Sequence, residues 1–144
     1  MTKLLNIALL GVAPIAKLHL KSATGELLFA DAERTLPVRI HLHGPGSEIA
    51  SLVQSRQTAR ALKRMQDNDD KVTAASPEER KAETAADLAT LTAGFENFTY
   101  GDGSLNGEPL YQAVYSDLTL GFVTKQVTKF FGDWGNFSTA SNAG

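Results

Sequence analysis

The sequence predicts an α+β fold, with a small N-terminal antiparallel sheet of two or three strands followed by about four helices. Two patterns carry this prediction. Between residues 16 and 43 apolar and polar residues alternate with a period of two, which is typical of half-buried strands. After residue 47 apolar residues recur every three or four positions, which is typical of helices. At 144 residues we expect one domain, over 15–137, between an apolar arm at 1–14 and a flexible tail at 138–144.

The N-terminal arm places Lys3 before the apolar run 4–12. A secretory signal peptide is one interpretation, but cleavage after Ala13 would leave Pro14 next, and Asn6 interrupts the run. The run is also too short to span a bilayer. We therefore expect the arm to pack on this domain or on a neighbour, which keeps a homo-oligomer among the expected partners.

Three segments have strand patterning: 16–21, 27–29 and 37–43. A turn joins the first two, and Gly25 in it can supply a positive φ. A sheet this small needs helices on its apolar face to be stable.

Serine caps mark the first two helices. Ser47 precedes one, and Ser76 followed by Pro77 and Glu79 is a strong start for the other. A charged break at 67–71 separates them. Later segments are predicted as follows: a loop or short strand at 95–100, a turn at 101–107, and a short helix from Pro109.

The last helix is expected to start at the N-cap Asp117 and to end near Gly132. Its apolar stripe consists of Val123, Val127, Phe130, Phe131 and Trp134. For the whole chain, the residues expected to be largely buried are Leu18, Leu20, Val38, Ile40, Leu42, Ile49, Leu52, Leu88, Val123, Val127 and Phe130.

Composition narrows the functional classes. The net charge of -2 shows no basic excess that would favour nucleic acid, and the chain has no cysteine for disulfides or thiolate zinc sites. No nucleophile motif, phosphate-cradling loop or dinucleotide fingerprint is present. We therefore predict no catalytic residue, no cofactor and no enzyme activity.

Three histidines form a candidate metal cluster. His41 and His43 share a strand face, and His19 joins them if the strands pair. Lysines and arginines surround them, which opposes a metal, and no carboxylate is fixed nearby in the sequence. We expect polar side chains on the solvent face of the sheet and no metal site.

The densest basic feature is Arg56, Arg60 and Arg64, close to one helix face with Lys63. The first interpretation is a solvated face balanced by the acidic residues of 67–70. The second is a docking surface for an acidic or amphipathic partner helix, and nucleic acid is a further alternative.

Two aromatic stretches near the C-terminus carry a resemblance to a known family. Tyr115, Asp117, Gly121 and Phe122 fill a Tyr-x-Asp-x-x-x-Gly-Phe pattern, and a Gly-Asp-Trp-x-Asn-Phe pattern occupies 132–137. They resemble the C-terminal part of the small tail assembly chaperones of long-tailed bacteriophages. The likeness also takes in 95–98 and the basic helix at 56–64, but only the C-terminal third matches in distinct residues.

The resemblance implies a non-enzymatic protein of the infected host cytoplasm, absent from the mature virion. It would bind the phage tape measure protein and help recruit subunits of the tail tube protein, with no nucleic-acid or membrane partner. The alternative function is a virion structural protein, such as a head–tail joining or tail terminator subunit.

The partner surface is expected at the C-terminal aromatics. Trp134 and Phe137 lie at and beyond a glycine-broken helix end, where a core is least able to enclose both. Exposed aromatics can anchor an interface, whereas a core role for Trp134 is the competing interpretation. The candidate partner-binding residues are Trp134, Phe137, Phe131, Arg56, Arg60 and Arg64.

Overall fold

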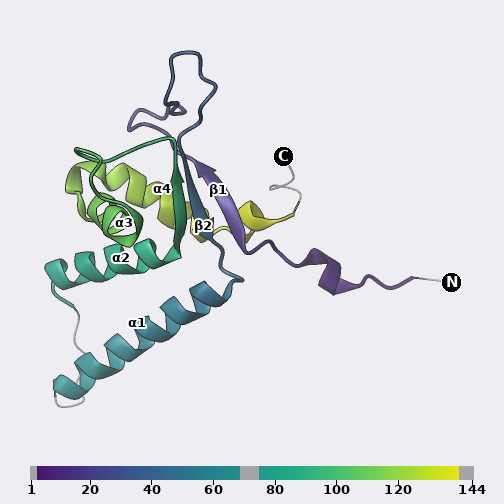
Figure 1. Ribbon diagram of the computed structural model, residues 1–144. Helices are drawn as coiled ribbons and strands as arrows, with labels where there is room; N and C mark the ends of the chain where they lie inside the picture. The colour runs from purple at the N-terminus through teal and green to yellow at the C-terminus, as the bar shows by residue number, and fades with distance from the viewer. Residues whose placement is uncertain (1–2, 69–74, 140–144) are drawn as a thin grey trace.

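The computed structural model describes residues 3–68 and 75–139. It confirms the α+β class: a three-stranded antiparallel sheet and four α-helices (Figure 1). The strands are β1 (Ile15–His19), β2 (Arg39–His43) and β3 (Thr92–Glu96), in the spatial order β1-β2-β3. The α-helices are α1 (Glu48–Asp67), α2 (Pro77–Leu91), α3 (Gly107–Ser116) and α4 (Gly121–Phe131). Short 3₁₀ turns are η1 (Ile7–Leu10), η2 (Leu118–Leu120) and η3 (Trp134–Phe137).

The third strand comes from a different place than the alternation suggested. Residues 27–29 were predicted as a return strand but make only isolated bridges, Lys21 with Leu27 and Phe29 with Pro37. The Asp31 carboxylate accepts hydrogen bonds from the backbone N–H groups of Thr35 and Leu36, in the loop between this segment and β2. The third strand of the sheet is β3, which follows α2 directly and pairs with β2.

Serine caps begin the two helices as predicted. The Ser47 hydroxyl accepts from the Ala50 N–H at 3.2 Å, and the Ser76 hydroxyl accepts from the Glu79 N–H at 3.2 Å. Asp117 caps the turn η2 instead of the last helix, accepting from the Thr119 N–H at 2.9 Å. Of the charged break at 67–71, residues 69–71 lie outside the described residues, as do 140–144 of the predicted tail.

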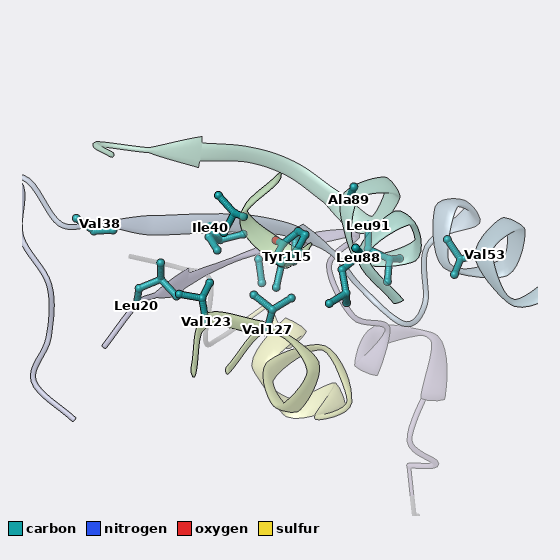
Figure 2. Packing of buried hydrophobic residues seen from close by; sticks show 14 of the residues in the cluster. Leu20, Val38, Ile40, Val53, Leu88, Ala89, Leu91, Tyr115, Val123 and Val127 are labelled. Atoms are coloured by element: carbon teal, nitrogen blue, oxygen red, sulfur yellow. The ribbon is translucent and has the colours of Figure 1, made fainter. Parts of the chain in front are cut away.

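The core lies between the sheet and helices α2, α3 and α4 (Figure 2). The core prediction is confirmed for seven residues: Leu20, Val38, Ile40, Leu42, Leu88, Val123 and Val127. Leu18, Ile49 and Phe130 are partly buried against this cluster. The predicted burial of Leu52 was wrong, since this residue is 58% exposed. Its helix α1 lies to one side of the molecule and buries only Val53 (Figure 1).

The arm runs away from the body of the domain (Figure 1). Its base is pinned, because the Ala13 N–H donates to the Phe137 carbonyl at 2.7 Å and the Pro14 carbonyl accepts from Gly44 at 2.8 Å. Beyond Val12, which packs on the core, every residue of 3–11 is exposed. Of the described part of the arm, Val12, Ala13 and Pro14 therefore contact the domain, whereas residues 3–11 are exposed.

Candidate functional site

A groove opens where the end of α4 meets the start of α1. Its volume is about 350 Å³. The lining residues are Pro45, Ala50, Ser51, Val53, Gln54, Gln57, Leu91, Phe131 and Trp134. None of these side chains carries a charge, so the groove is suited to an apolar or neutral side chain.

Trp134 stands at this groove and is 55% exposed. Asp133 caps the turn η3 by accepting from the Gly135 N–H at 3.0 Å, which sets the ring just after the helix end. Gly46 lies beneath the ring: a Cβ added there would be 3.3 Å from Trp134 Cζ3 and 3.1 Å from Val12 Cγ2. The ring therefore rests on bare backbone, with half of its surface in solvent, and does not continue the buried stripe of α4.

Phe137 occupies the opposite environment, and its predicted exposure was wrong. The turn η3 reverses the chain and inserts this ring into the core, where it is 0% exposed. It packs edge-on against Phe130 at 5.4 Å between centroids, and a Cβ on Gly44 would lie 2.6 Å from Phe137 Cδ1. Glycine at position 44 leaves room for the ring. The segment after the last helix is therefore buried at Phe137, although its glycines had suggested that this end of the chain is exposed. Phe137 therefore presents no surface to a partner.

The three arginines of α1 are partly exposed and pair with carboxylates of α2. Arg56 and Arg60 each place Nη2 2.8 Å from Asp87 Oδ1, and Arg64 pairs with Glu83. A charge balance from the acidic residues of 67–70 was predicted. The partners that the structure describes come from α2, while residues 69 and 70 lie outside the described residues. The arginines join two helices of the same chain, so they are not a free docking face.

Asp87 is the centre of this cluster, with only 6% of its surface exposed. Burial by itself raises the pKa of the Asp87 carboxyl, but hydrogen bonds from Arg60, Gln57 and Arg56 outweigh that effect and lower the pKa. The same contact with Asp87 raises the pKa of Arg60. Both groups are therefore ionised at neutral pH and hold α1 against α2.

The histidines are spread over the polar face of the sheet and each has its own surroundings. His41 Nε2 lies 2.6 Å from Glu96 Oε1, while His19 Nε2 lies 2.8 Å from the Leu28 carbonyl oxygen. Burial lowers the pKa of His43. A carboxylate does stand beside His41, contrary to the prediction, and the hydrogen bond from His41 lowers the pKa of Glu96. Within residues 3–68 and 75–139 no three potential metal ligands come together.

A second cavity, of about 460 Å³, lies between α2 and α4. Its rim carries the cations Arg80, Lys81 and Lys125 and one carboxylate, Asp117. The Asp117 oxygens already accept from the Thr119 hydroxyl at 2.6 Å and the Tyr100 hydroxyl at 2.8 Å, which lowers the pKa of Asp117. No unengaged base faces this cavity from the residues that line it.

Two of the residues that organise these sites escaped the sequence analysis. Asp87 lies among the buried residues Ala85, Leu88 and Ala89 of α2, and a carboxylate at such a position signals a buried cationic partner. Glu96 gave no such signal, because its pairing with His41 depends on the register of β2 against β3.

Searches of protein-family models, of curated proteins and of solved structures found no match to this chain. Among the helices that the structure describes, none has the length and apolar character needed to cross a bilayer.

Proposed function

We propose that this chain is a non-enzymatic tail assembly chaperone of a long-tailed bacteriophage. It binds the tape measure protein in the host cytoplasm, helps recruit tail tube subunits, and leaves before the virion matures. The observation that carries the proposal is the position of Trp134: a half-exposed aromatic at an uncharged groove, inside the stretch 132–137 that resembles the chaperone family.

The groove has the chemistry of a docking site for an apolar side chain of a helix. An amphipathic helix binds by seating apolar side chains in such grooves. The family resemblance implies a tape measure protein that is long, helical and prone to aggregate. Trp134 and Phe131 provide aromatic surface on one side, and Pro45 and Val53 provide aliphatic surface. The candidate partner residues thus reduce to Trp134 and Phe131, because Phe137 is buried and the arginines are paired within the chain.

The proposal that the chain is not an enzyme is supported by the state of its ionisable groups. The carboxylates of Asp87, Glu96 and Asp117 are engaged with cations or hydroxyl groups, and the hydrogen bonds that they accept lower the pKa of each. A general base needs a pKa near the working pH, so lowered carboxylate pKa values suit structural roles.

The test is co-expression with the cognate tape measure protein. We expect the wild-type chain to keep that protein soluble and to co-purify with it. Trp134→Ala should capture less, whereas Leu118→Ala, which also removes an exposed apolar side chain but lies outside the groove, should capture as much as the wild type. Failure of the wild type to capture the tape measure protein would reject the proposal.

The second candidate is a virion structural protein such as a head–tail joining or tail terminator subunit, and the exposed arm at 3–11 favours it, because extended arms link subunits of an assembly. Mass spectrometry of purified particles separates the two functions. A chaperone is absent from the particles, whereas a joining or terminator subunit is present at a fixed copy number.

A further inference from the structure

The arm is the most apolar exposed surface of the described chain. Five of its side chains are between 60% and 86% exposed: Leu4, Leu5, Ile7, Leu9 and Leu10. They cluster around the turn η1, which the Asn6 side chain caps by accepting from the Ala8 N–H at 3.2 Å. A contiguous apolar group of this kind marks a surface that another surface covers.

The base of the arm stands next to the Trp134 groove. Val12 and Trp134 both lie over Gly46, and the hydrogen bonds of Ala13 and Pro14 fix the direction in which the arm leaves. Residues 3–11 can span at most about 30 Å when extended. The arm and the groove are adjacent on one copy. A twofold axis beside them therefore brings the arm of each copy within reach of the groove of the other copy.

The two surfaces match in charge. Residues 4–12 carry no ionisable side chain, and neither does the lining of the groove. Seating the arm there therefore removes no charge from water. The cavity between α2 and α4 is a poorer acceptor, since Arg80, Lys81 and Lys125 at its rim would lose hydration under an apolar arm.

The area favours exchange in both directions. Burying a leucine or isoleucine side chain removes roughly 60–120 Å² of apolar surface, so the three seated side chains of one arm offer on the order of 250 Å². One seated arm, counted with the surface it covers, gives on the order of 500 Å², below the ~1,000 Å² expected of a specific interface. Two reciprocal arms give on the order of 1,000 Å², which reaches that size.

We propose that two copies of this chain form a closed dimer by exchanging their N-terminal arms, with Leu5, Ile7 and Leu9 of each copy seated in the Trp134 groove of the other. The arms then cover the groove that the proposed function assigns to the tape measure protein, so the partner must displace an arm to bind. Because the test below needs only this chain, failure of arm exchange and failure of tape measure binding are seen separately.

Light scattering coupled to size-exclusion chromatography should give twice the chain mass of 15.4 kDa for the wild type. Leu5→Asp/Leu9→Asp should give the single-chain mass, and so should Ser51→Glu, which places a charge in the groove at an exposed position. The matched control Leu118→Asp alters an exposed leucine outside both surfaces and should stay dimeric. A monomeric wild type, an arm variant that keeps the double mass, or an open series of larger assemblies would each overturn the closed dimer.

A cross-link distinguishes exchange from an arm that folds back on its own domain. The chain has no cysteine, so Leu9→Cys/Ser51→Cys introduces the only two thiols. Oxidation of the exchanged dimer yields a species of double mass on a non-reducing gel, and reduction returns it to the single chain. A cross-link within one chain, or no cross-link at all, would contradict the exchange.

Discussion

Helices α1 and α4 are both amphipathic, but they are held to the molecule in different ways. Helix α4 and the following turn η3 insert Val127 and Phe137 fully into the core. Helix α1 is nearly twice as long, yet it buries only Val53 and is joined to α2 through Arg56, Arg60 and Arg64. An apolar stripe in the sequence therefore does not reveal whether a helix is held by apolar burial or by ion pairs. The charged residues on its other face have to be considered as well.

The groove at Trp134 is formed by residues from both of these regions. The segment after α4 places a core ring and a surface ring three residues apart, Phe137 and Trp134. On the α1 side, Ala50, Ser51 and Val53 complete the groove that Trp134 borders. The groove is thus built between a strongly anchored element and a more weakly anchored one.

The largest effect is expected from Phe137→Ala. Removing a fully buried aromatic ring costs about 3–5 kcal/mol of unfolding free energy, because it leaves a cavity against Phe130 and Gly44. Urea unfolding of the variant and the wild type measures this loss. A change below about 1 kcal/mol would show that η3 is not part of the core.

Asp87→Ala should cause the second-largest loss of unfolding free energy. The substitution leaves the guanidinium groups of Arg56 and Arg60 without their shared carboxylate. Because these arginine side chains are 37% and 23% exposed, water can replace part of the lost contact, and the expected cost is about 1–3 kcal/mol. Glu78→Ala is the matched control on the same helix, since Glu78 is exposed, and a change of no more than about 1 kcal/mol is expected. Equal effects of the two variants would refute a special role for Asp87.

Acid pH should weaken the same contact. The pKa of Asp87 is lower in the folded chain than in the unfolded one, where it is about 3.9. Its contribution is thus present above that value and is lost as the pH falls through the folded pKa. Between pH 5 and pH 3 the wild type should lose more unfolding free energy than Asp87→Asn does. Parallel pH profiles for the two proteins would contradict the assignment.

The smallest effect is expected from Leu62→Ser on α1. Leu62 is 50% exposed, so the unfolding free energy should change by no more than about 0.5 kcal/mol. A calorimetric scan compares the melting temperatures. A loss above about 1 kcal/mol would mean that the apolar side of α1 is covered in solution.

The features that local chemistry determines were predicted from the sequence. The caps at Ser47 and Ser76 and the inward face of Val38, Ile40 and Leu42 are confirmed, because a cap and a period of two involve only neighbouring residues. The positive φ expected of Gly25 is also present, at 90°.

The features that depend on distant residues were missed. The third strand comes from 92–96, which pairs with β2 across a long stretch of sequence. Phe137 is buried because Gly44, far away in the sequence, leaves space for its ring. Of the candidate site, the sequence predicted Trp134 and Phe131. The α1 side of the groove depends on where α1 lies relative to the end of α4, which local patterns do not determine.

The most direct test of the account compares Trp134→Ala with the wild type in two measurements on the same preparation, a thermal melt and binding to the tape measure protein. We predict a smaller loss of stability than of binding: the unfolding free energy falls by no more than about 1–2 kcal/mol, because part of the ring packs over Gly46, and the affinity falls by at least about 2 kcal/mol, roughly 30-fold in Kd. A strongly lowered melt with binding retained by the folded fraction would place Trp134 in the core instead, and undiminished binding with an unchanged melt would remove Trp134 from the partner surface.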